Sequence, residues 1–164
     1  MYGLLNQRHL ADVATEVCDC LGYGANGTAR DILMETAGAE TIFGTYKDET
    51  KFAGMGITQF DKSPFYDVRT RASVSDRKRI EEYFNIDIDL VDWKDLRYNP
   101  LLAMLFTRLK YKKITAEIPE TLMGRAEYWK EHYNTKLGKG TTSKYLAASK
   151  HYGRLSEISE IRYG

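Results

Sequence analysis

The segment from Asn99 to Lys112 constrains the fold of this chain most. Asn99 and Pro100 precede the most apolar run of the sequence, in which large apolar side chains recur at helical spacing: Leu101, Leu102, Leu105, Phe106 and Leu109. Asparagine is a preferred N-cap residue, and proline is favoured in the first helical turn. The pattern predicts a helix over residues 100–112 that buries one of its faces.

Further helices are expected before this segment. Residues 4–21 carry apolar side chains near helical spacing, and Thr28 is the expected N-cap of a second helix that runs to about Ala39 or Glu40. Ser63 and Pro64 are typical of a helix start, and Ser75 is the expected cap of a helix over residues 76–84. The first half of the chain is therefore predicted to be mainly helical.

Two more helices are expected after it. Pro119 is expected to begin a helix that includes Trp129 and ends near Asn134. After a glycine-rich break, Thr142 or Ser143 is expected to cap a last helix that ends at about Tyr152. The intervening segments differ, because residues 44–58 are rich in Gly and Thr and suit short strands and turns, while residues 87–90 suit a short extended piece or a loop. The expected fold class is mainly α (α+β), with a small β-hairpin-like insertion after the second helix.

Composition predicts one domain. The chain has 164 residues, 43% apolar and 29% charged, with a mean hydropathy of −0.49, which is typical of a globular protein with a sizeable core. No internal repeat or linker divides it, so we expect a single domain over residues 1–153 and a C-terminal tail over residues 154–164. No segment is apolar for long enough to span a bilayer, and the N-terminal segment lacks the pattern of a signal peptide, so no stable membrane insertion is expected.

Charge is distributed unevenly along the chain. The first hundred residues carry 12 Lys and Arg against 17 Asp and Glu, and the remaining 64 carry 12 against 6. A basic surface for an anionic polymer such as nucleic acid or peptidoglycan is one interpretation. The other, which we favour, is that the two parts of one domain neutralise each other, so that no nucleic-acid partner is expected.

Cysteine and histidine do not form a recognisable site. Cys18 and Cys20 are the only cysteines, and their spacing on a helix points them to different faces, so we expect buried free thiols. The three histidines, His9, His132 and His151, are widely spaced and have no metal-ligand pattern with the cysteines. We therefore expect neither a metal nor a cofactor.

The chemistry of the chain is expected to centre on Glu40. This glutamate follows an apolar helical run and precedes Thr41-Ile42-Phe43-Gly44, so a helix end and partial burial can both raise the pKa of its carboxyl. A carboxylic acid that is protonated near neutral pH can act as a general acid. The second glutamate, Glu35, lies roughly 140° away around an ideal helix, so the two do not form a dyad, although Glu35 alone is an alternative acid.

A second segment follows, in which Gln59 lies nineteen residues after Glu40. Gly56-Ile57-Thr58-Gln59 and Phe60 combine glycine, which lets the backbone approach a bulky ligand, with an amide that can both donate and accept a hydrogen bond. The pair of segments resembles the active-site signature of the lysozyme-like superfamily, and most closely its soluble lytic transglycosylases and phage peptidoglycan hydrolases. There, Glu-Ser-x-aromatic is followed by Gly-x-x-Gln, and Thr41 here stands where serine is usual.

The resemblance extends, in motifs only, over about residues 30–146. Asn99 to Phe106 is similar to a family helix that carries a tyrosine where this chain has Phe106, and the segment from Tyr128 to Thr135 is similar to the end of phage-type cell-wall hydrolases. The resemblance implies a lysozyme-like fold with Glu40 as the catalytic residue. It implies substrate contacts at Thr41, Gly56, Gln59, Phe60, Phe106, Tyr133 and Asn134. A core role is favoured for Trp129.

The expected function is cleavage of the β-1,4 bond between N-acetylmuramic acid and N-acetylglucosamine in peptidoglycan. Glu40 serves as general acid and base in a lytic transglycosylase, or as acid in a muramidase in which Asp48 or Asp61 supplies a second carboxylate. The resemblance implies a monomeric, phage-encoded protein, made in the host cytoplasm, that reaches the wall with a holin or in the virion. The alternatives are a lysozyme-like phage module that binds glycan without cutting it and a basic helical nucleic-acid-binding domain.

Overall fold

The computed structural model describes residues 2–46, 54–134 and 140–150, and these residues are mainly helical. The α-helices are α1 (Gln7–Leu21), α2 (Ala29–Thr41), α3 (Lys62–Arg71), α4 (Val74–Phe84), α5 (Pro100–Lys112) and α6 (Leu122–His132), and residues 142–150 are helical as well. Two 3-10 helices, η1 (Ile88–Leu90) and η2 (Trp93–Leu96), precede α5. The described ranges contain no strand, and their β structure is an isolated antiparallel bridge between Met55 and Phe60. The mainly α class is therefore confirmed.

Local capping signals in the sequence predict correctly where α5, the helix expected to be most apolar, begins. The Asn99 side chain accepts a hydrogen bond from the Leu102 N–H at 3.1 Å, and Pro100 occupies the first turn, so α5 begins and ends where predicted. Thr28 is the N-cap residue of α2 as expected, but its hydroxyl lies 3.3 Å from the Ile118 carbonyl and makes no capping hydrogen bond to the helix. The interaction with a distant loop has replaced the local cap.

The predicted starts of α4, α6 and the last helix were wrong by a few residues. Helix α4 is capped by Ser73, whose hydroxyl accepts from the Asp76 N–H at 3.0 Å, rather than by Ser75. Helix α6 begins at Leu122 after the N-cap Thr121, and not at Pro119. The helix at 142–150 is preceded by Thr141, whose hydroxyl accepts from the Lys144 N–H at 3.1 Å. Neighbouring hydroxyl residues are equivalent as caps in sequence, and only the register of the packed helix selects one of them.

Two other expectations also change. Helix α1 begins after Asn6, and not at residue 4, because the Asn6 side chain accepts a hydrogen bond from the His9 N–H at 2.8 Å. The segment 87–90 is neither extended nor a plain loop, because residues 88–90 form the 3-10 helix η1. The predicted tail over residues 154–164 lies outside the described residues.

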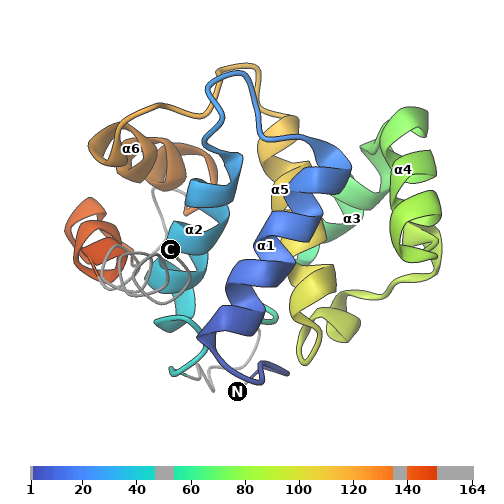
Figure 1. The fold of residues 1–164 in the computed structure, drawn as a ribbon, viewed down its shortest axis with the longest axis horizontal. Helices are drawn as coiled ribbons and strands as arrows, with labels where there is room; N and C mark the ends of the chain where they lie inside the picture. The colour runs from blue at the N-terminus through green and yellow to red at the C-terminus, as the bar shows by residue number, and fades with distance from the viewer. Residues whose placement is uncertain (1, 47–53, 135–139, 151–164) are drawn as a thin grey trace, which may run out of the picture.

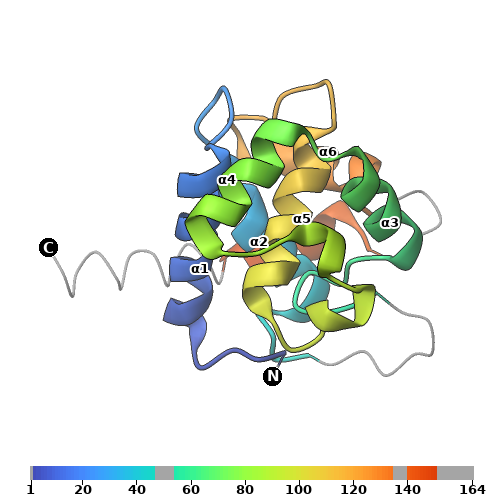
Figure 2. The same ribbon diagram turned by 90° about the vertical axis from the view of Figure 1, so that its right-hand side faces the viewer.

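Helix α5 lies in the middle of the molecule. It packs against α1, α2, α3 and η2. Figures 1 and 2 show α6 and residues 142–150 beside α2 at one side of α5, with α3 and α4 at the other side. The sequence predicted one buried face, but the buried set extends around the helix: Pro100, Leu102, Ala103, Met104, Leu105, Phe106, Thr107, Arg108, Leu109 and Tyr111. A helix that is apolar on most sides is stable only when other helices surround it.

Polar groups of α5 are hydrogen-bonded inside the core. The Thr107 hydroxyl lies 2.7 Å from the Ala103 carbonyl and 2.8 Å from the Thr58 hydroxyl, and the Arg108 Nε donates to the Gly22 carbonyl at 3.0 Å. Gly22 is the C-cap of α1, so the guanidinium also offsets the negative end of that helix. These contacts satisfy groups that would otherwise destabilise the core.

The two cysteines are buried and free, as predicted. Both lie on α1, and burial raises the pKa of the Cys18 thiol to about 11. A thiol with so high a pKa is protonated at neutral pH and is a poor nucleophile. Cys18 therefore serves as a small core residue.

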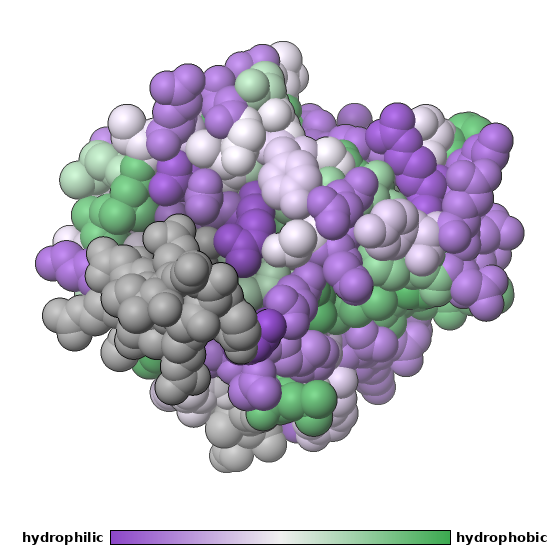
Figure 3. Space-filling view, in the orientation of Figure 1, coloured by the Kyte–Doolittle hydropathy of each residue, from purple (hydrophilic) through white to green (hydrophobic). Residues whose placement is uncertain are grey.

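The face of the molecule in Figure 3 is mostly hydrophilic, with several smaller apolar areas between the polar side chains. Single exposed apolar residues such as Leu5 and Leu90 are normal on a folded protein. No helix in the described part of the chain combines the length and the apolar character that a membrane span requires.

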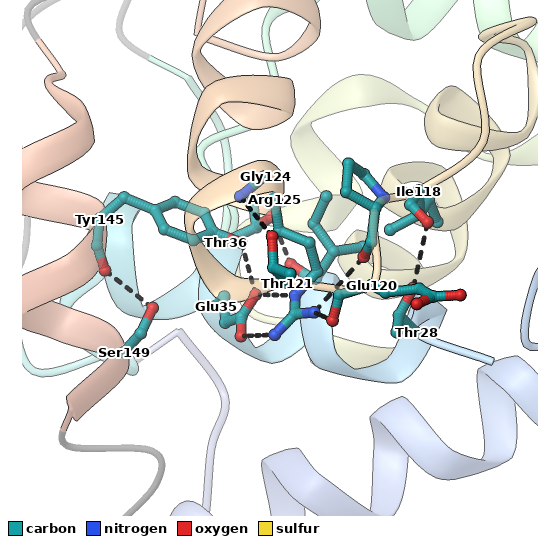
Figure 4. A network of polar contacts seen from close by, with 12 residues as sticks. Thr28, Glu35, Thr36, Ile118, Glu120, Thr121, Gly124, Arg125, Tyr145 and Ser149 are labelled. Atoms are coloured by element: carbon teal, nitrogen blue, oxygen red, sulfur yellow. Dashed lines mark hydrogen bonds and ion pairs between the residues drawn. The ribbon is translucent and has the colours of Figure 1, made fainter. Parts of the chain in front are cut away.

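A buried ion pair joins three helices on the α2 side of α5. Glu35 of α2, whose exposed fraction is 3%, accepts hydrogen bonds from the Arg125 Nε at 2.7 Å and Nη2 at 3.0 Å. The hydroxyl of Tyr145, from the helix at 142–150, donates to the same carboxylate at 2.7 Å. The Arg125 Nη1 donates in turn to the Glu120 carbonyl at 2.7 Å (Figure 4). The pair therefore determines how α6 and the last helix lie against α2.

We expect substitutions of Glu35 and Arg125 to have non-additive effects on the free energy of unfolding. Glu35→Gln or Arg125→Met should each lower the free energy of unfolding by about 3–5 kcal/mol, because each leaves an uncompensated buried group. The apolar replacement Glu35→Leu/Arg125→Met/Tyr145→Phe should cost less than either single change. Denaturant unfolding at pH 7 measures these differences. Glu82→Gln, at the exposed Lys78–Glu82 pair with a separation of 3.9 Å, is the control and should have little effect. If the combined variant lost as much free energy of unfolding as the single variants together, the interpretation of Glu35 and Arg125 as a coupled buried pair would be contradicted.

Candidate active site

Glu40 lies in the last turn of α2, where the chain reverses sharply. Ile42, Phe43 and Gly44 follow with φ of 50°, 54° and 83°. The Ile42 and Phe43 N–H groups donate to the Gly38 and Ala37 carbonyls at 3.0 and 3.1 Å, which satisfies the helix end. A positive φ is unfavourable for a β-branched residue such as Ile42, and such strain concentrates at functional sites. The backbone therefore supports a functional role for this helix end.

The second predicted segment forms a tight turn beside it. Met55 and Phe60 exchange backbone hydrogen bonds of 2.9 and 3.0 Å, and the Gln59 N–H donates to the Gly56 carbonyl at 3.0 Å. Gly56 has a φ of 78° and packs so closely that a Cβ would lie 2.3 Å from the Leu96 carbonyl oxygen. Glycine is required at this position for both reasons.

Thr41 links the two segments. Its hydroxyl lies 2.8 Å from the Ile57 carbonyl oxygen and accepts a hydrogen bond from the Gly44 N–H at 3.0 Å. The exposed fraction of Thr41 is 0%, so its hydroxyl is used inside the protein. The structure thus brings the two sequence motifs together and makes Thr41 a positioning residue rather than a surface group.

The predicted aromatic residues are buried behind the site. Phe106 stacks on Phe65 with centroids 4.5 Å apart, and Phe60 meets the rings of Phe106 and Tyr133 edge to face at 6.1 Å. The Tyr133 hydroxyl donates to the Thr58 carbonyl at 2.6 Å. These three predicted substrate contacts, Phe60, Phe106 and Tyr133, therefore lie in the core, where they support the turn at residues 56–59.

Gln59 and Asn134 are only half-buried. The Gln59 Nε2 donates to the Gly56 carbonyl at 2.9 Å and lies 3.4 Å from the Tyr2 hydroxyl. Asn134 follows α6, and its Oδ1 accepts from the Lys130 Nζ at 3.1 Å. Of the predicted polar contacts, these two side chains have the access that a bound ligand requires.

The surroundings of Glu40 change its acidity. Burial raises the pKa of the Glu40 carboxyl to about 7, and the nearby negative charge of Asp61 acts in the same direction. The side chains of Asn134 and Trp129 and the charge of Lys110 oppose the rise. A half-buried carboxyl with a pKa near 7 can both give and take a proton at neutral pH.

Lys110 is a site residue that the sequence analysis missed. The Lys110 Nζ lies 4.3 Å from the ring centroid of Tyr133 and 5.6 Å from that of Phe60. Burial lowers the pKa of Lys110, while the charges of Asp61 and Glu40 favour its protonated form. Lys110 lies four residues after Phe106 on α5, and this spacing was the available signal.

The two candidate glutamates have different environments. Burial raises the pKa of Glu35, and the guanidinium of Arg125 and the hydroxyl of Tyr145 oppose that rise. Both oxygens of Glu35 are occupied by these donors. Glu40 is the more accessible of the two and lies beside the turn at residues 56–59, so the geometry favours Glu40 as the acid.

Other ligating groups are few near the site. Within the described ranges, no group of three or more His, Cys, Asp or Glu side chains could hold a metal ion. Of the two carboxylates predicted as a second acid, Asp61 is exposed and acts on Glu40, whereas Asp48 lies outside the described residues.

Comparison of the chain with protein-family models, with curated proteins and with solved structures finds no match. Any function assigned to the chain therefore rests on the side chains and the geometry described above.

We expect Gly56→Ala to destabilise the protein more than Gly24→Ala. Gly24 also has a positive φ, 80°, but an added Cβ there meets nothing closer than 4.0 Å. Gly24→Ala should therefore cost only backbone strain, about 1 kcal/mol. Gly56→Ala adds a collision with the Leu96 carbonyl and should cost about 3–4 kcal/mol. Chemical denaturation measures both, and equal losses would contradict the packing of this turn.

Proposed function

We propose that this protein is a peptidoglycan-cleaving glycosidase, a lytic transglycosylase of the lysozyme-like class in which Glu40 is the general acid. The observation that carries the proposal is the half-buried Glu40 carboxyl, with a pKa of about 7, beside a glycine turn to which Thr41 joins the same helix end. Neither motif alone is specific, but the fold brings both to one place.

Glu40 begins the reaction by giving its proton to the glycosidic oxygen. The C1–O bond of the muramoyl residue breaks, and an oxocarbenium-like centre forms as Glu40 becomes a carboxylate. The carboxylate then takes the proton of the muramoyl 6-hydroxyl while that oxygen attacks C1. The products are a 1,6-anhydro end and a free hydroxyl on the leaving sugar, and Glu40 is protonated again. Lys110 and Asn134 stabilise Glu40 while it is charged.

Gln59 and Asn134 are the proposed sugar contacts, because their amides are polar and only half-buried. Thr41, Phe60, Phe106 and Tyr133 support the site from within. The lysozyme-like fold and its β-hairpin-like insertion are part of the proposal. The Met55–Phe60 bridge supports the insertion, whereas residues 47–53 lie outside the described ranges.

The biological setting is proposed from the same motif set. A phage-encoded, monomeric protein would be made in the host cytoplasm and would act on the wall in the periplasm, released with a holin or carried in the virion. A non-catalytic glycan-binding module is the alternative. An acidic group tuned to a pKa of about 7 favours the enzyme, since binding alone does not require that tuning.

We expect Glu40→Gln to reduce the release of soluble fragments from purified peptidoglycan by at least ~100-fold, because the amide has nearly the same shape but cannot deliver the proton. Glu127→Gln, the same change at an exposed position of α6, is the control and should retain full activity. Glu35→Gln should retain more activity per folded molecule than Glu40→Gln. Full activity in Glu40→Gln, or lysis lost in Glu35→Gln alone, would reverse the assignment.

Stability supplies an independent measurement on the same Glu40→Gln variant. The ordinary pKa of 4.5 applies in the unfolded chain and about 7 in the folded one. As pH rises from 4.5 to 7, the unfolded state ionises first, so wild-type stability falls and then levels off. Glu40→Gln should therefore match the wild type below pH 4.5 and exceed it by up to about 3 kcal/mol above pH 7. A difference that does not depend on pH would show that Glu40 is not held neutral by the fold.

The products distinguish the transglycosylase from a muramidase. We expect mass spectrometry of the fragments to show 1,6-anhydro ends, and we expect Asp61→Asn to leave turnover within roughly tenfold. Asp48→Asn should behave in the same way. Reducing ends, together with a collapse of activity in folded Asp61→Asn, would instead assign Asp61 as the carboxylate that activates water.

A further inference from the structure

Trp129 of α6 contains a buried donor with no partner. The exposed fraction of its side chain is 1%, and the indole Nε1 makes no hydrogen bond within the described part of the chain. A buried N–H without a partner is unfavourable and uncommon in folded proteins. The other tryptophan, Trp93, shows the usual arrangement, because its Nε1 donates to the Phe60 carbonyl at 2.8 Å.

The indole of Trp129 is held in place from two sides. Its ring lies 5.2 Å from that of Tyr145, whose hydroxyl donates to Glu35. On the other side, a Cβ at Gly140 would lie 2.5 Å from both the Trp129 Cη2 and the Asn134 Nδ2, so only glycine fits there. The indole and the amide therefore both lie against Gly140.

Both of these side chains act on Glu40. The amide of Asn134 and the indole of Trp129 lower the pKa of the Glu40 carboxyl against the effect of burial. The Lys130 ammonium donates to the Asn134 Oδ1 at 3.1 Å, which leaves the Nδ2 as the donor toward Glu40. The Trp129 indole is thus close enough to Glu40 to affect its carboxyl, although the Nε1 makes no hydrogen bond in the described part of the chain. Catalytic hydrogen bonds are often loose before substrate binds and tighten in the reacting complex.

We propose that the Trp129 indole N–H is a positioning donor for Glu40, which binds the carboxylate once Glu40 has given up its proton. This inference rests on the proposed function. The bond forms when the charge appears, so it stabilises the state in which the glycosidic bond has broken. It weakens again when Glu40 takes the proton of the muramoyl 6-hydroxyl. Preorganised donors of this kind require little reorganisation during the reaction.

Other ionisable groups also surround Glu40. Asp61 at the N-cap of α3 is an exposed carboxylate, and burial lowers the pKa of Lys110 on α5. Tyr111 and Tyr133 also face Glu40, and burial raises the pKa of both, so they stay neutral. Removal of the Trp129 N–H leaves all four of these groups in place, so the resulting change in the titration of Glu40 reports on the donor.

The test compares Trp129→Phe with Trp93→Phe, since both remove an indole N–H from the core. We expect Trp129→Phe to raise the Glu40 pKa by about one unit, measured by carbon NMR of the labelled carboxyl. The pH at which kcat/KM declines on the alkaline side should rise by the same amount, because Glu40 stays protonated up to a higher pH. At pH 6, kcat should fall about tenfold or more. Trp93→Phe should leave the Glu40 pKa unchanged.

The outcomes separate the two proposals. If Trp129→Phe lowers activity but moves neither the NMR titration nor the pH profile, the indole serves packing alone and the inference is overturned. If the wild type cleaves no peptidoglycan while Trp129→Phe still raises the Glu40 pKa, the proposed function fails and the donor contact stands. Should Trp129→Phe not fold, benzothienylalanine at position 129 keeps the shape of the indole without its N–H, and the same titration then decides.

Discussion

The burial of α5 on most of its sides is the constraint on which the other elements depend. Helices α1, α2 and α3 and the 3-10 helix η2 cover it, and the apolar area removed from water favours this arrangement at roughly 25 cal/mol per Å². Phe106 and Lys110 extend from the same helix to the Met55–Phe60 turn and the Tyr133 ring. The packing that stabilises the domain therefore also positions the aromatic residues that lie behind Glu40.

The two glutamates of α2 are both desolvated by burial, but they have different partners. Glu35 is enclosed by Arg125 and Tyr145, so its position is set by charge-assisted hydrogen bonds that join three helices. Glu40 is desolvated with weaker compensation from Asn134, Trp129 and Lys110, and the pKa of its carboxyl rises to about 7. Such desolvation destabilises the folded state at neutral pH, and this cost is typical of active sites, where stability and reactivity conflict.

Part of the fold and of the candidate site could be predicted from sequence. The bounds of α5 follow from Asn99, Pro100 and the apolar spacing, and the association of Glu40 with residues 56–59 follows from the order of the two motifs. The caps at Ser73, Thr121 and Thr141 could not be selected, because adjacent hydroxyls or a nearby proline carry equal local signals. The aromatic residues expected to contact substrate are buried, because local sequence does not show which residues the rest of the chain covers.

The sequence by itself determined where helices form, which residues break them, and which carboxyl has a motif around it, because these properties depend on groups a few residues apart. The tertiary structure decided what each side chain does. Arg125 reaches Glu35 across ninety residues, Tyr133 reaches Thr58 across seventy-five, and Lys110 meets the ring of Tyr133 from another helix. Water is excluded from Glu40 only when these distant segments have packed together, so its pKa is a property of the folded chain and not of the motif.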